Sequence, residues 1–171
     1  MRARINGRLA TATAALIAVA AIAIAVTGTA NAGPETGTKG QTREFVRALE
    51  HKDLETITEL THREATLTLP LSFTGNREDA ARFTGKDQVL GYVQGVFKTM
   101  GKIDFTGVRV STTPDGNTSF VQAAGNFTTA DGRPYENDYI FRYDWKNGRL
   151  VHIEEYGNPI TFCNVIGSPA C

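Results

Sequence analysis

The chain has 171 residues, of which 41% are hydrophobic and 21% charged, a composition typical of a globular domain. Its 18 basic and 18 acidic residues balance, and no cluster of Lys and Arg forms a basic stripe. Because binding to nucleic-acid phosphates needs such a surface, we exclude nucleic acid as a partner.

The first 32 residues have the pattern of a secretory signal peptide. Three arginines lie near the start, and a run rich in Ala, Ile and Val follows over residues 9–26. Ala30-Asn31-Ala32 then places small residues at both key positions before a cleavage point. We therefore expect a secreted or extracytoplasmic protein that begins at Gly33. The apolar run approaches the length that spans a bilayer, so an uncleaved membrane anchor is the alternative.

Cleavage there leaves 171 − 32 = 139 residues, with 18 − 3 = 15 basic against 18 acidic residues and a net charge of −3. This length suffices for one domain with a sizeable core. Residues 33–40 (GPETGTKG) predict a flexible leader, residues 41–162 the domain, and residues 163–171 a C-terminal tail.

The first half of the domain alternates between helical and strand patterns. Residues 42–60 predict two helices with a break at residues 51–53, where Asp53 can cap the second helix. Residues 66–73 alternate as a strand, in which Pro70 indicates an edge or a bulge. Residues 75–82 predict a polar loop, and residues 85–100 a third helix.

The second half predicts four strands. They cover residues 103–112, 119–128, 135–145 and a run that follows residues 146–149, with turns at residues 114–117, 130–132 and 146–149. Asn147-Gly148 between the last two strands is a strong hairpin signal. The alternation of residues 119–128 is too weak to identify the inward side. The order α-α-β-α-β-β-β-β predicts the α+β class, with a curved antiparallel sheet wrapped over the N-terminal helices.

The hairpin places one carboxyl group among apolar neighbours. Residues 135–145 alternate between an aromatic side and a mostly charged side, and in the second strand Val151, Ile153 and Glu155 share one side. A carboxyl group on a core face is costly unless it is paired, hydrogen-bonded or neutralised. Glu155 is therefore either the centre of a functional site or a satisfied structural carboxylate.

The cysteines and histidines bear on disulfide formation and metal binding. Cys163 and Cys171 both lie in the tail, and outside the cytosol we expect them to form a disulfide. His51, His62 and His152 are scattered and offer no metal-ligand spacing. We therefore predict no metal site and no cofactor.

Three short motifs identify a family resemblance. They are Ala-Thr-x-x-x-Pro at residues 65–70, Phe-Thr-Gly-Lys at residues 83–86, and Gly-Arg-Leu followed by Glu-Tyr-x-Asn-Pro within residues 148–159. With the two N-terminal helices, this pattern resembles the SnoaL-like branch of the nuclear transport factor 2-like superfamily. It is similar to the phenazine-biosynthesis A/B proteins and, more distantly, to limonene-epoxide hydrolase and ketosteroid isomerase. The resemblance implies a cone-shaped, cystatin-like α+β barrel, a fold that hosts isomerases, cyclases, hydrolases and binding modules.

Position by position, the resemblance leaves one catalytic candidate. The general base of ketosteroid isomerase would correspond to Leu69, and its oxyanion-binding tyrosine would fall near Phe45. Two positions of the charged relay in the epoxide hydrolases would fall near Gln122 and Ala124. None of these four residues can take over the role. The last acid of that relay, and an acid of the phenazine proteins, correspond to Glu155, which can act as a general acid if burial raises its pKa.

We therefore predict that the domain binds a small apolar or aromatic molecule inside the cone, with Glu155 as the main polar contact. The predicted ligand-binding residues are Tyr139, Asn137, Leu69, Phe73, Gln122, Trp145 and Ile153. The missing relay partners favour non-catalytic binding or an unassigned activity. The alternative is a cofactor-independent isomerase, cyclase or hydrolase that uses Glu155 as general acid or base. The resemblance also allows a homodimer through the outer sheet face.

Overall fold

The computed structural model describes residues 37–167 and residue 171, all of which belong to one compact unit. The predicted signal peptide and the first part of the predicted leader lie outside the described residues. Within the described part of the chain, no helix has the length and hydropathy of a membrane span.

The two predicted N-terminal helices are confirmed. Helix α1 (Thr38–Glu50) begins inside the predicted leader, and α2 (Leu54–Leu60) follows after a short turn. Lys52 in that turn has a φ of 55°, and the Asp53 side chain accepts a hydrogen bond from the Thr56 backbone N–H at 3.0 Å. This cap satisfies a donor of the first turn of α2, as the sequence predicted.

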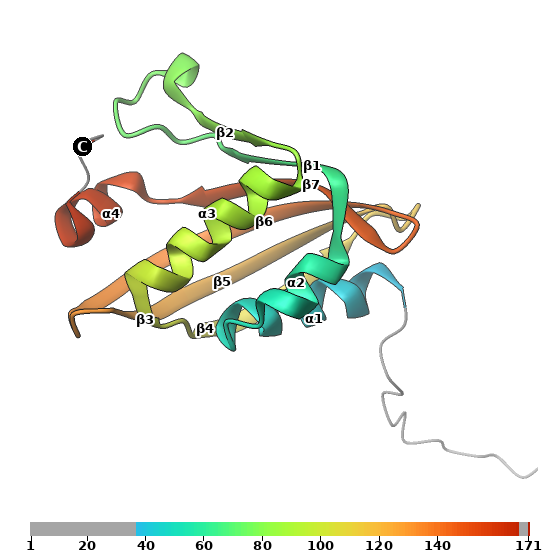
Figure 1. The fold of residues 1–171 in the computed structure, drawn as a ribbon, viewed down its shortest axis with the longest axis horizontal. Helices are drawn as coiled ribbons and strands as arrows, with labels where there is room; N and C mark the ends of the chain where they lie inside the picture. The colour runs from blue at the N-terminus through green and yellow to red at the C-terminus, as the bar shows by residue number, and fades with distance from the viewer. Residues whose placement is uncertain (1–36, 168–170) are drawn as a thin grey trace, which may run out of the picture. The chain divides into compact units, whose positions relative to one another are not determined.

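Seven strands form one curved, open sheet (Figure 1). They are β1 (Thr61–Leu69), β2 (Ala81–Thr84), β3 (Met100–Lys102), β4 (Phe105–Thr112), β5 (Thr118–Thr129), β6 (Pro134–Lys146) and β7 (Arg149–Gly157). Their order is β2-β1-β7-β6-β5-β3, and β4 also pairs with β5. All pairs are antiparallel except β1 with β7. A parallel pair needs a long connection, which the intervening part of the domain supplies.

The predicted strand at residues 66–73 is shifted in the structure. Strand β1 begins at Thr61 and ends at Leu69, directly before Pro70, which has no N–H to donate to a sheet. It lies between β2 and β7, so Pro70 marks the end of an interior strand rather than an edge or bulge. The predicted polar loop contains a short 3-10 turn and β2, which pairs with β1.

The predicted hairpin of β6 and β7 is confirmed. Asn147 and Gly148 have φ values of 50° and 75°, which match the turn that joins two-residue hairpins. The register shifts between the pairs Asp144–His152 and Trp145–Leu150, which leaves Val151 as the extra residue. Leu150 and Ile153 are consequently both buried, whereas Val151 is half-buried and does not share the inward side as predicted.

Helices cover the concave side of the sheet, and a further helix follows β7 (Figure 1). Helix α3 (Lys86–Thr99) matches the third predicted helix. Helix α4 (Pro159–Ile166) was not predicted and crosses the boundary between the predicted domain and tail. Its signals were present in the sequence, because an Asn cap precedes Pro159 and Gly167 follows the last turn.

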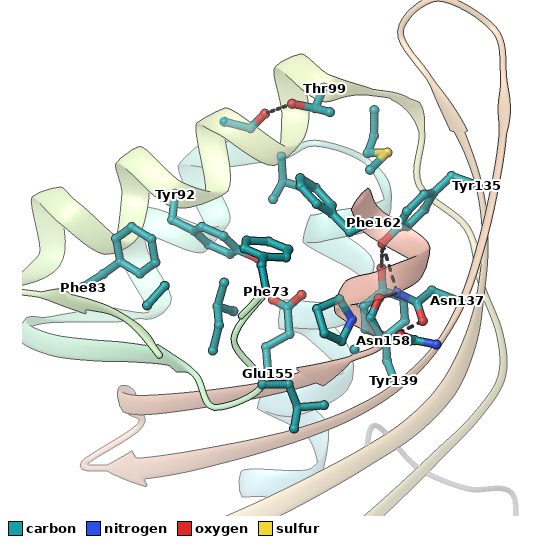
Figure 2. Close-up of a pocket in the computed structure, with 18 residues that line it drawn as sticks. Phe73, Phe83, Tyr92, Thr99, Tyr135, Asn137, Tyr139, Glu155, Asn158 and Phe162 are labelled. Carbon is teal, nitrogen blue, oxygen red and sulfur yellow. Dashed lines mark hydrogen bonds between the residues drawn. The ribbon is translucent and has the colours of Figure 1, made fainter. Parts of the chain in front are cut away.

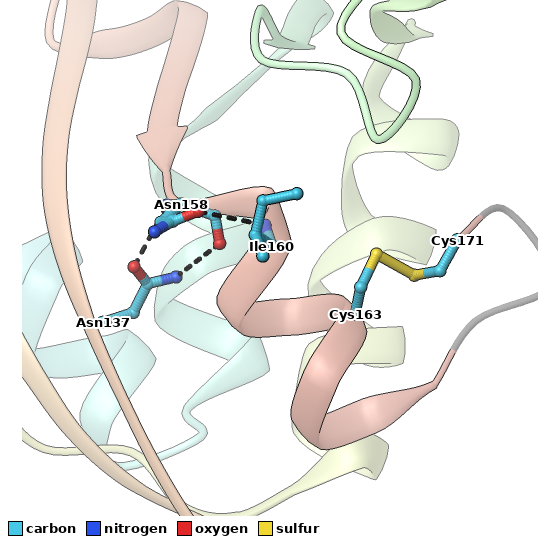
Figure 3. The surroundings of a disulfide bond; sticks show 5 residues. All are labelled: Asn137, Asn158, Ile160, Cys163 and Cys171. Atoms are coloured by element: carbon cyan, nitrogen blue, oxygen red, sulfur yellow. Dashed lines mark hydrogen bonds between the residues drawn. A yellow bond between two sulfur atoms is a disulfide. The ribbon is translucent and has the colours of Figure 1, made fainter.

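Cys163 on α4 forms the predicted disulfide with Cys171 (Figure 3). The two cysteines are separated by 8 positions in the sequence. A bridge over so short a loop removes little entropy from the unfolded chain. It therefore acts as a local clip on α4.

Candidate functional site

A cavity of about 370 Å³ opens between α3, the β1–β2 segment, the ends of β6 and β7, and α4 (Figure 2). This volume lies in the range of small-molecule sites. Much of its wall is apolar, with contributions from Leu69, Phe73, Phe83, Val96, Met100 and Phe162. Glu155 is the one acidic residue among the described residues that line it, and none of them is Lys, Arg or His.

A smaller chamber of about 90 Å³ adjoins this cavity on the side of the core. Tyr92, Tyr139 and Glu155 line both spaces. Most of the chamber's other walls are apolar side chains, including Leu49, Val93, Phe105, Phe127 and Phe141. Glu155 thus lies between the cavity and the smaller chamber.

Glu155 and Tyr92 form a hydrogen-bonded pair in this wall. Strand β7 presents Glu155 opposite Phe141 of β6, and α3 presents Tyr92 from the other side. The Tyr92 hydroxyl donates to Glu155 Oε2 at 2.9 Å. Two contacts of α3 fix this geometry, since Val89 and Val93 of the same helix are buried in the core.

Burial dominates the electrostatics of this pair. Desolvation raises the pKa of Glu155 to about 7, and the hydrogen bond from Tyr92 opposes that rise. The pKa of Tyr92 is also raised, by burial and then by the negative charge of Glu155. Near neutral pH, Glu155 therefore populates both its protonated and its ionised form, which suits a group that gives and takes a proton.

A second polar cluster occupies the wall formed by β6 and the start of α4. The Tyr139 hydroxyl donates to the Tyr135 oxygen at 3.4 Å, and Asn137 Nδ2 donates to the same oxygen at 3.0 Å. Asn137 is held by the backbone of Asn158, whose N–H donates to Asn137 Oδ1 at 3.0 Å. Figure 2 shows these groups facing the cavity together.

Two glycines position the Tyr139 ring. A Cβ atom on Gly125 of β5 would lie 2.7 Å from Tyr139 Cε2, and one on Gly157 of β7 would lie 2.9 Å from Tyr139 Cε1. Real Cβ atoms do not approach so closely, so both strands carry glycine where the ring lies across them. The sequence of the neighbouring strands thus leaves room for the ring against the sheet.

Aromatic contacts connect the segments that close the cavity. The centroid of the Phe73 ring, just after β1, lies 5.4 Å from the centroid of the Phe162 ring of α4. The ring centroids of Phe83 in β2 and Tyr92 in α3 lie 5.0 Å apart. Cys163, which carries the disulfide, follows Phe162 directly in the sequence.

The structure brings five of the eight predicted site residues together. These are Glu155, Tyr139, Asn137, Leu69 and Phe73, which all line the cavity. Phe73 reaches it from the segment after β1 rather than from the predicted strand.

The other three predicted residues do not line this cavity. Trp145 is buried in the core, where its indole N–H donates to Ser119 Oγ at 3.1 Å, and Ile153 is buried as well. Gln122 is exposed and pairs with Arg109 on the outer side of the sheet. The prediction for Gln122 is wrong because the residues on either side of it in β5, Val121 and Ala123, have the buried side chains, so Gln122 faces the other way.

Several cavity residues were missed by reasoning from the sequence. Tyr92 lies within the third predicted helix, and Phe162 is the last residue of the predicted domain, but neither was assigned a role. Tyr135 was part of the predicted aromatic side, but its hydrogen bonds depend on the bend of β6 toward α4. In the described part of the chain, no three His, Cys, Asp or Glu side chains group closely enough to hold a metal ion.

Comparisons with known proteins identify the relatives of this chain. The uncharacterized protein YesE of Bacillus subtilis (strain 168) is 26% identical over 126 residues, which cover 73% of this chain and 84% of YesE. The solved structure of a candidate isomerase from Bacillus subtilis is similar with a TM-score of 0.64 and 26% identity, over 74% of this chain and 90% of that one. A phenazine biosynthesis-related protein from Pseudomonas aeruginosa has a TM-score of 0.59 and 18% identity, over 77% of this chain and 88% of that one.

These similarities confirm the predicted fold class. The mixed helix-and-strand architecture with a curved, open sheet is shared with nuclear transport factor 2-like proteins. The predicted similarity to phenazine-biosynthesis proteins and ketosteroid isomerase is confirmed at the level of the fold. The family model of the SnoaL-like domain matches residues 42–153, more than half of the chain. The chain therefore belongs to the SnoaL-like domain family.

Proposed function

We propose that the cavity binds a small, largely apolar molecule and that Glu155 moves a proton on it, without a cofactor, as general acid or base. The observation that supports this proposal is the Glu155–Tyr92 pair, with the carboxyl group in an apolar cavity and its pKa raised to about 7. The sequence favoured non-catalytic binding because it offered no titratable partner for Glu155. Tyr92 is such a partner, within hydrogen-bond distance.

The proton transfer uses the two oxygens of Glu155 differently. Oε2 accepts the Tyr92 hydrogen bond, so Oε1 is the oxygen left to meet a ligand. In its ionised form Glu155 takes a proton as a C–H or O–H bond of the ligand breaks, and in its protonated form it returns the proton to another position. The Tyr92 hydroxyl stabilises the negative charge on the carboxylate between these steps.

One relative gives this proposal support of a different kind. The Bacillus subtilis structure described as a candidate isomerase is 26% identical to this chain. Isomerisation is a reaction that one acid–base residue can carry out, because the proton removed is the proton returned. The more distant neighbours are similar in fold and do not bear on the reaction.

The second candidate function is binding without turnover. It is favoured by the lone carboxyl group, since the described residues that line the cavity include no second Asp or Glu and no Lys, Arg or His. A carrier would use the same apolar walls and the same polar contacts. The two functions differ in whether ligand protons exchange.

The experiment begins with native mass spectrometry of protein from its own host, which identifies a co-purifying molecule. That molecule is then incubated with the protein in D2O, and deuterium incorporation is followed. Wild-type protein is expected to catalyse exchange and Glu155→Gln to abolish it, because the amide cannot take up the proton. Glu154→Gln is the matched control, since that neighbouring carboxylate accepts from Tyr156 at 3.0 Å and lies near Arg142, away from the cavity. Binding without exchange in the wild type would establish the carrier function.

Two further features of the protein are also proposals. The N-terminal pattern supports export and cleavage before Gly33, and N-terminal sequencing of secreted protein that still began at Met1 would favour the membrane anchor instead. Ile140 and Phe120 on the outer sheet side are 51% and 39% exposed, which supports a homodimer through that side. Light scattering that gives the monomer mass at high concentration would refute the homodimer.

A further inference from the structure

The hydroxyl groups of Tyr135 and Tyr139 supply more hydrogen-bond donors than their surroundings use. Each phenol has one proton, and a single hydrogen bond of 3.4 Å joins the two oxygens. Whichever phenol donates in that bond, the proton of the other is left over. Among the described residues, neither hydroxyl donates a hydrogen bond to any other acceptor.

Asn137 cannot accept the remaining proton, because its orientation is fixed. Its Oδ1 accepts hydrogen bonds from the backbone N–H groups of Asn158 at 3.0 Å and of Asp138 at 2.9 Å. An N–H group donates only to the oxygen of an amide, so the Nδ2 end must face Tyr135, to which it donates at 3.0 Å. The amide therefore adds a donor to the cluster and no acceptor.

The leftover proton lies in a buried position beside the cavity. Tyr135 and Tyr139 are 3% and 7% exposed, and both line the cavity. Buried donors normally have a partner, since leaving one unpaired costs free energy. Two donors that point at the Tyr135 oxygen also polarise its own O–H group and make it a stronger donor.

We propose that the Tyr135–Tyr139 pair is a donor subsite that binds a hydrogen-bond acceptor of an uncharged ligand, such as a carbonyl oxygen. This inference rests on the proposed function and specifies the ligand of the same cavity. Tyr139 lies diagonally from Glu155 on the neighbouring strand, because Phe141 is opposite Glu155 in the register. The Cα atoms of diagonal neighbours are about 7–8 Å apart, and both side chains line the same cavity. The ligand is therefore polar at two points with a short apolar span between them.

The charge of the cavity excludes anionic ligands. No Lys, Arg or His lies among the described residues that line it, and Glu155 carries a negative charge when ionised. A carboxylate or phosphate in this space would find no countercharge, and burying an unpaired charge is strongly unfavourable. The subsite thus selects a neutral acceptor by its donors and rejects an anion by its charge.

The test uses three probes of one shape: tetralin, which has no acceptor, 2-tetralone, which has a carbonyl group, and tetralin-2-carboxylate, which is an anion. Their affinities for the full protein are measured by NMR titration. Wild-type protein is expected to prefer 2-tetralone, and the double variant Tyr135→Phe/Tyr139→Phe to bind it about three- to ten-fold more weakly. Each single variant keeps one phenol proton and should lose much less. Tetralin binding should be unchanged in all variants.

Tyr143→Phe is the matched control. Tyr143 lies on the same strand and is buried, but it does not line the cavity, and its hydroxyl has no hydrogen-bond partner in the described part of the chain. Its removal should leave the affinity for every probe unchanged. Melting temperatures of all variants check that the fold is retained.

Three results would overturn the subsite. They are an unchanged 2-tetralone affinity in the double variant, an equal loss in a single and the double variant, and tight binding of the carboxylate. If 2-tetralone binds to wild-type protein but one of these three results is found, the subsite is wrong and the proposed function stands. If none of the probes shifts the signals of cavity residues in wild-type protein, the proposed function fails together with the subsite.

Discussion

Replacing Glu155 by Gln should change the pH dependence of stability in a way that reports directly on the cavity. Gln has nearly the same shape, and its amide oxygen can still accept the Tyr92 hydrogen bond. The amide does not titrate, so the substitution removes the cost of burying a carboxylate and little else. We expect Glu155→Gln to fold and to be at least as stable as wild type above neutral pH.

The sign follows from proton linkage. Burial raises the pKa of Glu155 from 4.5 to about 7 in the folded protein. Between these values the folded chain holds a proton that the unfolded chain has lost, so the free energy of unfolding of wild type falls as pH rises. The contribution of Glu155 is fully present below the lower pKa and is lost as pH rises through the upper one. At about 1.4 kcal/mol per pKa unit, the change amounts to about 3 kcal/mol.

The assay compares the variant with wild type by urea unfolding from about pH 4 to about pH 8, because the difference between the two chains cancels the other titrating groups. The variant should gain about 3 kcal/mol relative to wild type across this window. Glu154→Gln is the control for a carboxylate on the outer side of the same strand. A flat difference for Glu155→Gln would show that the carboxyl group is solvated, and a difference of the opposite sign would make it a structural anchor.

Three other substitutions test neighbouring parts of the site. Tyr92→Phe removes the hydrogen bond that lowers the pKa of Glu155, so a carboxyl titration by NMR should show that pKa rising, and an unchanged value would mean that the bond does not form. Gly157→Ala should cost about 1–3 kcal/mol of stability because the new methyl group displaces the Tyr139 ring, and unfolding as stable as wild type would contradict the close contact. Replacing both cysteines by serine should lower the free energy of unfolding by less than about 3 kcal/mol, since the loop is short. A larger decrease in denaturant unfolding would show that the disulfide stabilises more of the protein than α4.

The sequence by itself determined α1, α2, α3, the hairpin and the inward side of Glu155, because these depend on local patterns. A helical period over residues 42–60 and 85–100 needs no knowledge of the rest of the chain. Asn147-Gly148 selects its turn through the φ values that these residues tolerate. Alternation along β7 then places Glu155 on the same side as Ile153.

Other features of the site were decided only by the tertiary structure. Tyr92 and Glu155 are 63 positions apart, and the packing of α3 against the sheet brings them together. Gln122 faces outward because the pairing of β5 with its neighbours fixes which side of the strand is buried. The weak sequence alternation of that strand did not identify the buried side. The phenol pair likewise depends on long-range contacts, since Asn158 holds the amide that orients Tyr135. Periodicity specifies the side of an element on which a residue lies, whereas the partner across the cavity depends on how distant elements pack.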